Sequence, residues 1–223
     1  MNCVLCLSRL IFAHKEDLQA RCAGNRYATD NACYRTLLYT LMLASLIRDI
    51  GISTFSVLSF IYSLANAILS GVAQGLQPLW GHCYGKQDTE EMGWYFRSGI
   101  IINLVLSILI YGGLFFLDVP VIRIFNKETA LVQTATAALP IFSLSFIPMA
   151  LNLIFTAFLF STKRTGVADV IAISRGIIVK ALAIFCIPIL FGSNAIWIAP
   201  FVAETITLVL AVVLSKTSKL AYQ

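Results

Sequence analysis

The chain has 223 residues, of which 59% are hydrophobic and only 12% are charged, and its mean hydropathy is +0.85. Soluble domains are about half apolar and a quarter charged, so this composition argues against a soluble enzyme and predicts an integral membrane protein. The 16 Lys and Arg residues outnumber the 11 Asp and Glu residues. Membrane proteins use such an excess to fix their orientation, and we therefore expect the lipid bilayer, and no nucleic acid, as a partner.

Residues 1–35 form a polar segment that we interpret as a cytosolic lead-in of unknown role. Its apolar start lacks the positive n-region and the cleavage site of a signal peptide. The segment contains four of the six cysteines and one of the two histidines, namely Cys3, Cys6, Cys22, Cys33 and His14. A zinc site is conceivable, but the second cysteine pair lacks the close spacing of zinc ligands. We therefore expect neither a metal site nor a catalytic site.

Residues 36–215 are predicted to form an all-α, polytopic membrane bundle of about six transmembrane helices, followed by a cytoplasmic tail at 216–223. A spanning helix needs about 20 residues, so the first apolar block, Thr36–Ile47, is a marginal span. Five further spans are predicted over Ile52–Trp80, Trp94–Leu117, Ala130–Phe160, Val167–Phe191 and Asn194–Leu214.

The loops between these spans predict the orientation. If the junction from Gly81 to Arg97 is cytoplasmic, alternation places the turn from Ser161 to Gly166, the lead-in and the tail on the same side. These segments hold most of the Lys and Arg residues, and the positive-inside rule then predicts a multi-pass protein of the cell membrane with both termini in the cytoplasm.

The second span carries a polar stripe, because polar residues recur there at steps of three and four and so share one helix face. The stripe consists of Ser56, Ser59, Ser63, Asn66, Ser70 and Gln74, with Gln77 one step further. This face is predicted to avoid lipid. A water-filled cavity and a tight helix seam both explain it, and Gly71-x-x-x-Gly75 favours the seam without deciding between them.

Two later spans repeat the pattern. Asn103 shares a face with Ser107 and Tyr111, and Asn152 shares a face with Ser145, Pro148 and Thr156. Three striped helices predict a common polar interior. Pro140 and Pro148 each remove a backbone donor within one span, so that span is expected to bend.

The charged residues that are most costly to insert within the last two spans are Arg175, Lys180 and Glu204. Lys180 lies about 17 Å below Phe191 and Glu204 about 15 Å below Asn194, counted at about 1.5 Å per residue on either side of a tight turn at Gly192-Ser193. At equal depth they are predicted to pair, either as a fixed structural ion pair, the favoured reading, or as a proton- or ion-coupling site. Arg175 lies nearer the cytoplasmic end and can snorkel there.

The helix of the second span is predicted to end in the glycine-rich segment from Gly71 to Gly85. The segment reads Gly71-x-x-Gln74-Gly75-x-Gln77-Pro78-Leu79-x-Gly81-x-x-Tyr84-Gly85-x-x-Asp88. It resembles the helix-to-loop signature of the multidrug and toxic compound extrusion (MATE) transporters. Phe125-Asn-Lys-Glu-Thr129 resembles the extracytoplasmic loop of that family, and Pro200-x-x-x-Glu204 resembles its last helix.

The resemblance implies two six-helix bundles, of which this chain resembles only the carboxy-terminal one, since the signature occurs once. It implies a half-length or truncated secondary transporter and not an enzyme. With a second lobe or a second copy of the chain, it would export drugs or organic cations by Na+ or H+ antiport. No cofactor beyond that coupling ion is implied. Some members hold the ion with acids on the first and fourth helices of this bundle, but Ala130–Phe160 contains no acid.

Two alternatives remain open: a membrane protein like the flippases of lipid-linked oligosaccharides, and a non-transporting remnant or interaction protein. The candidates for a substrate or ion pathway are Asn66, Gln74, Gln77, Asn103, Asn152, Lys180 and Glu204.

Overall fold

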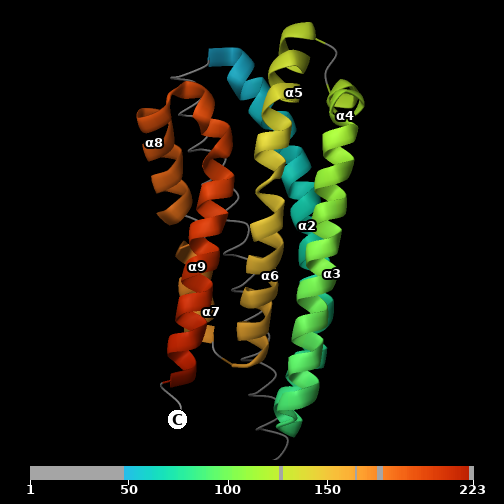
Figure 1. The fold of residues 1–223 in the computed structure, drawn as a ribbon, viewed down its shortest axis with the longest axis vertical. Helices are drawn as coiled ribbons and strands as arrows, with labels where there is room; N and C mark the ends of the chain where they lie inside the picture. Colours follow the sequence, from blue (N-terminus) through green and yellow to red (C-terminus); the bar gives the residue numbers. More distant parts are fainter. Residues whose placement is uncertain (1–47, 126–127, 164, 175–177, 221–223) are drawn as a thin grey trace, which may run out of the picture.

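The computed structural model describes residues 48–125, 128–163, 165–174 and 178–220, and the regular elements in these ranges are all helical (Figure 1). The predicted lead-in, the marginal span Thr36–Ile47 and residue Arg175 lie outside the described residues. The predicted all-α bundle is confirmed. Three described helices are long and apolar enough to cross a membrane, or four if one bent pair counts as a single span.

Helix α2 runs from Arg48 to Lys86 and so ends one residue beyond the segment Gly71–Gly85 that is predicted to contain its end. The glycine-rich segment is helical throughout, and none of its glycines has a positive φ. The chain turns instead at Gln87, whose φ is 58°. Asp88 then caps the next helix by accepting a hydrogen bond from the Glu91 amide at 3.0 Å. Helix geometry therefore ends at the capping residues and not at the glycines.

Helix α3, Thr89–Phe116, lies against α2 and is followed by the short helix α4, Asp118–Phe125. The two long helices approach closely at Gly99, where a Cβ atom would lie 2.6 Å from Leu76 Cδ1 and 3.5 Å from Trp80 Cζ2. The absence of a side chain at this position is what permits the contact.

The predicted span 130–160 is confirmed as bent. It consists of α5, Thr129–Ser143, and α6, Phe146–Ser161, whose axes differ by 42°. The break at Leu144 and Ser145 falls between Pro140 and Pro148, the two positions where the sequence lacks a backbone donor.

The last part of the chain folds back on itself. Helices α7, Thr165–Ile173, and α8, Val179–Phe191, occupy the predicted span 167–191, which is thus described as two helices. The predicted tight turn follows at Gly192, whose φ of 89° suits glycine. A short 3-10 helix η2, Ser193–Ile198, then leads into α9, Ala199–Leu220.

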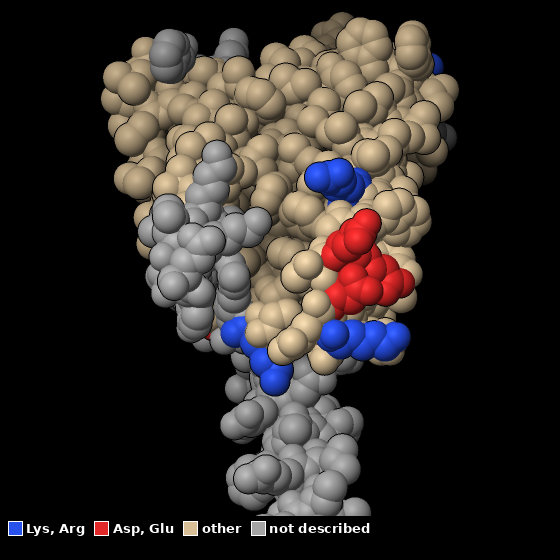
Figure 2. All heavy atoms as spheres, turned by 60° about the horizontal axis from the view of Figure 1, so that its bottom comes forward, with Lys and Arg blue, Asp and Glu red and all other residues tan. Residues whose placement is uncertain are grey.

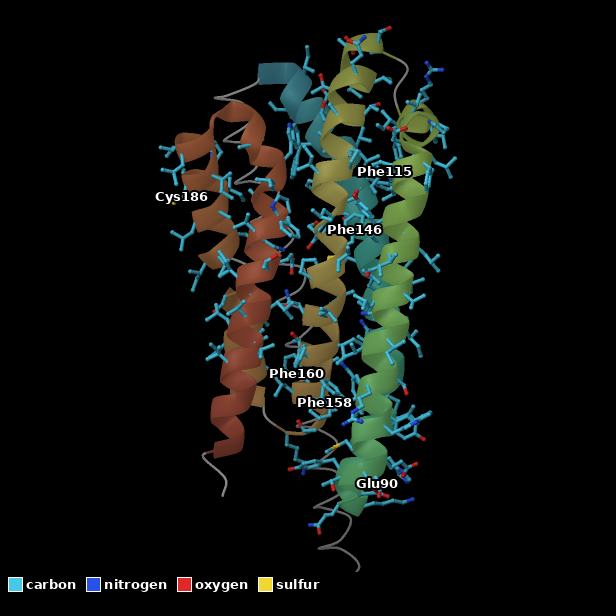
Figure 3. All side chains as sticks on the ribbon, in the orientation of Figure 1. Glu90, Phe115, Phe146, Phe158, Phe160 and Cys186 are labelled. Carbon is cyan, nitrogen blue, oxygen red and sulfur yellow. The ribbon has the colours of Figure 1, made fainter. Side chains whose placement is uncertain are left out.

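The main hydrophobic core lies between α2, α5, α6, α8 and α9, and fully buried members include Leu58, Leu139, Phe146 and Ile184. Figure 3 shows Phe146 inside the bundle and Cys186 on the outer side of α8. Many large apolar side chains of α3, α8 and α9 are exposed, including Leu109, Ile189 and Val209. An apolar exterior around an apolar core is the pattern expected of helices in lipid.

Charged residues gather around the α2–α3 turn at one end of the bundle (Figure 2). The α2–α3 turn lies at this end, and so does the carboxy-terminal end of α9 (Figure 1). Figure 2 shows acidic side chains between basic ones there. The exposed charged residues around the turn are Lys86, Asp88, Glu90, Glu91 and Arg97. The α2–α3 turn and the carboxy-terminal end of α9 therefore lie at the same end of the bundle, as the predicted alternation requires (Figure 1).

Candidate functional site: a buried polar cluster

The predicted pairing of Lys180 and Glu204 is confirmed. Lys180 Nζ on α8 lies 3.1 Å from Glu204 Oε1 on α9, and the Glu204 side chain is fully buried. Glu204 lies at the middle of the apolar stretch Ala195–Val213. The pair is therefore far from either end of its span, where insertion of a lone charge is most costly.

Two further side chains complete the group, which we call the Glu204 cluster (Tyr62, Asn152, Lys180 and Glu204). The Tyr62 hydroxyl on α2 donates to Glu204 Oε1 at 3.1 Å and accepts from Lys180 Nζ at 3.2 Å. Asn152 Nδ2 on α6 donates to Glu204 Oε2 and to the Glu204 main-chain oxygen, both at 2.9 Å. Four helices thus contribute one side chain each.

The surroundings of the cluster strengthen these contacts. The Tyr62 ring packs against Phe142 and Phe146, with centroid distances of 6.1 Å to each. Electrostatic attraction is larger in such apolar surroundings than in water, and an unpaired charge is correspondingly costly. One acceptor in the cluster has no partner, because Asn152 Oδ1 is buried and makes no hydrogen bond.

Sequence reasoning missed Tyr62. It lies on the apolar side of α2 among Leu58, Ala65 and Leu69, which are buried with it. The available signal was the hydroxyl itself, since a buried tyrosine needs a hydrogen-bond partner.

Asn103 does not join the cluster, although it is buried as well. Its Nδ2 donates to the Ala150 carbonyl at 2.8 Å, and Ser107 Oγ donates to the Leu104 carbonyl of its own helix at 2.8 Å. The stripe on α3 is therefore a seam with α6.

The stripe on α2 is only partly exposed. Ser56, Ser63 and Gln74 are exposed, Ser59, Asn66, Ser70 and Gln77 are half-buried, and Ser59 Oγ is buried without a hydrogen-bond partner. The hydroxyls of Ser56 and Ser63 donate hydrogen bonds to main-chain carbonyls one turn earlier in α2, at 3.0 and 2.9 Å. The prediction that all three stripes share one interior therefore fails for the exposed members of the α2 stripe, whereas the stripes on α3 and α6 face into the bundle.

The seam favoured by Gly71 and Gly75 is also absent from the described part of the chain. A Cβ atom at either position would meet nothing within 4 Å. No described helix uses these glycines for close packing, and the water-filled cavity remains the prediction for this face.

Metal-ligating residues do not gather within the described ranges, where no group of three or more His, Cys, Asp or Glu side chains could hold an ion. Cys83 and Cys186 are free thiols, the first buried and the second exposed. The zinc arrangement weighed for the lead-in lies outside the described residues.

Two solved transporters share this fold. One is described as the outward-facing conformation of a multidrug resistance MATE family transporter of the MOP superfamily; its TM-score is 0.79 at 11% identity, over 86% of this chain and 43% of the other. The second is a MOP superfamily transporter from Pyrococcus furiosus, reported with a binding pocket of reverse polarity; its TM-score is 0.76 at 13% identity, over 84% of this chain and 43% of the other. This chain therefore spans less than half the length of either transporter.

A comparison with curated proteins found no match. The sequence profile of the MatE family, in contrast, matches residues 33–185, which is more than half of the chain. The chain belongs to the MatE family.

Proposed function

We propose that this chain forms one lobe of a MATE-type secondary transporter. In combination with a second lobe, it would export drugs or organic cations by antiport with Na+ or H+. The observation that carries the proposal is the extent of the likeness: more than four fifths of this chain superimposes on each transporter, but on only 43% of that transporter. A transporter of this fold therefore needs further helices beside those described in this chain.

The outward polar face of α2 supports the same proposal. Ser56, Ser63 and Gln74 are exposed at helical spacing, beside exposed apolar residues such as Phe60 and Leu64. Polar side chains in a spanning helix normally face protein or water and not lipid. We assign the polar face to the substrate path, with Asn66, Gln74 and Gln77 along it, and the apolar face to lipid.

The charged end of the bundle supports a cytoplasmic position for the α2–α3 turn. Lys86, Arg97 and Lys163 are exposed there, and the positive-inside rule places such residues in the cytoplasm. We therefore propose a protein of the cell membrane whose carboxy-terminal end is cytoplasmic.

Two adjacent residues on α2 test the assignment of its faces. Ser63 and Leu64 are both exposed at the same depth, but they lie on the polar and the apolar face. In a variant without native cysteines, produced together with a second lobe, Ser63→Cys should react with a water-soluble maleimide. Leu64→Cys should remain unlabelled because lipid covers it. Equal labelling of both positions, or labelling of Leu64→Cys alone, would contradict the proposed path.

A further inference from the structure

We propose that the outer face of α3, near the α2–α3 turn, binds the headgroup of phosphatidylethanolamine. Arg97 would bind the phosphate of this lipid and Glu90 its ammonium group. The inference concerns a lipid partner and does not depend on transport. It starts from the order of the exposed side chains along the first turns of α3.

Four exposed residues share one face of α3. They are Glu90, Trp94, Arg97 and Ile101. At about 3.6 residues per turn they fall within a sector of about 60° around the helix axis. The buried residues Gly99 and Asn103 lie on the opposite side, and Gly99 faces Leu76 and Trp80 of α2. The face that carries the two charges therefore points away from the described helices.

Arg97 lies at the depth where the hydrocarbon core meets the headgroups. From Arg97 to Phe116, an 82% exposed residue at the other end of α3, the helix rises about 28 Å at about 1.5 Å per residue. The hydrocarbon core is about 30 Å thick. Trp94, which is 64% exposed, lies nearly one turn further out, and indole rings favour the membrane interface. Glu90, at the end of α3 (Figure 3), lies about 10 Å beyond Arg97 toward the water.

Neither charge is used within the described part of the chain. Of the other acids at the α2–α3 turn, Asp88 accepts a hydrogen bond from the Glu91 amide at 3.0 Å, and Glu91 accepts one from the Tyr95 hydroxyl at 3.3 Å. The side chains of Glu90 and Arg97 make no hydrogen bond or ion pair with another described residue. Both charges are therefore available to a ligand.

The order of the two charges matches a lipid whose cation lies outside its phosphate. The guanidinium of Arg97 suits a phosphate, because it can donate two parallel hydrogen bonds to it. In phosphatidylethanolamine, a short ethylene chain carries an ammonium group on the water side of the phosphate. Glu90 lies on that side, and a carboxylate accepts hydrogen bonds from such a group.

The same arrangement disfavours two other common lipids. Phosphatidylglycerol offers a phosphate to Arg97, but its negative charge has no counterpart at Glu90, and acidic side chains lie between basic ones at this end of the bundle (Figure 2). Phosphatidylcholine carries the same charges as phosphatidylethanolamine. Its quaternary ammonium group, however, has no N–H to donate to the Glu90 carboxylate. The face therefore selects a primary amine.

The test uses Trp94 as a reporter in the full chain. The chain is placed in phosphatidylcholine vesicles that contain a minor fraction of one lipid with brominated chains, which quench nearby tryptophans. The Trp94 signal is the emission that Trp94→Phe removes, since Trp80 and Trp197 are buried. Quenching should show that phosphatidylethanolamine binds beside Trp94 about two- to fivefold more strongly than phosphatidylcholine, as expected for an exposed ionic contact. Phosphatidylglycerol should bind less strongly than phosphatidylethanolamine.

Glu90→Gln should abolish the preference for phosphatidylethanolamine over phosphatidylcholine, and Arg97→Gln should weaken the binding of both. Glu91→Gln, which removes the same charge one residue further along α3, should keep the preference. Equal quenching by the two lipids in the parent chain would overturn the inference. So would a preference that survives Glu90→Gln, or stronger binding of phosphatidylglycerol. The parent chain decides by itself if a variant does not fold, and a failure of transport would count against the proposed function alone.

Discussion

At the scale of single residues, Lys180 and Glu204 each need the other as a buried counter-charge. Lys180→Met should lower the free energy of unfolding by about 3 to 5 kcal/mol, because it leaves a buried carboxylate without its counter-charge. The double variant Lys180→Met, Glu204→Met should recover most of this loss, since no unpaired charge remains. Unfolding in detergent by a denaturant would measure both effects.

The matched control for this cycle is Lys163→Met, which removes an exposed lysine. It should change stability by no more than about 0.5 kcal/mol. Additive losses from Lys180→Met and Glu204→Met in the double variant would show that the two residues do not stabilise each other.

The ion pair could be predicted from the sequence, but its tyrosine could not. A tight turn at Gly192 makes α8 and α9 antiparallel, so counting residues from the turn gives the depth of Lys180 and Glu204. Tyr62 is 118 positions before Lys180. Its contact depends on how α2 packs against α8 and α9, which a pattern within one helix does not specify.

At the scale of helices, the glycines of α2 and α3 have different roles. A Cβ atom at Gly99 would lie 2.6 Å from Leu76 Cδ1, so the Leu76 side chain would have to shift, whereas Gly71 faces open space. Gly99→Val should therefore cost about 1 to 3 kcal/mol through overpacking, while Gly71→Val should leave the stability of the isolated chain nearly unchanged. Thermal unfolding of the two variants compares them directly.

A second substitution shows whether crowding is the cause. Leu76→Ala removes the atom closest to the added side chain, and it should recover part of the stability lost in Gly99→Val. If Gly71→Val is as damaging as Gly99→Val, the packing account of these helices is wrong.

Helix boundaries were harder to predict than helix existence. The glycine-rich segment predicts a helix end by Gly85, yet α2 continues through its four glycines to Lys86, because helix propensity is a weak signal that the bundle overrides. The bend between α5 and α6 was predictable because proline removes a specific hydrogen bond. The capping hydrogen bond from Glu91 to Asp88 was the better sign of where α3 begins.

At the scale of the whole molecule, the basic residues at the end with the α2–α3 turn predict that this end faces the cytoplasm. Lys163 and Arg123 are both exposed, the first after α6 and the second near the end of α4. In a variant without native cysteines, Lys163→Cys should react with an impermeant maleimide in inside-out vesicles, and Arg123→Cys should react in intact cells. The reverse pattern would invert the proposed orientation.

The outward face of α2 was correctly recognised as polar, but the sequence could not show that it lies outside the described bundle. Periodicity shows which residues share a face, whereas exposure depends on which helices pack around it. Under the proposed function, a second lobe would complete this surface, since each solved transporter extends beyond the region that matches this chain.

Ethidium export from pump-deficient cells tests the central claim most directly. Cells would contain this chain alone, the inactive amino-terminal half of a full-length MATE transporter alone, or both together. That transporter's own carboxy-terminal half serves as the positive control. We predict background export from this chain alone and export above background when both are present. Export by the chain alone, or no export with both when the positive control succeeds, would contradict its role as one lobe of a two-lobe transporter.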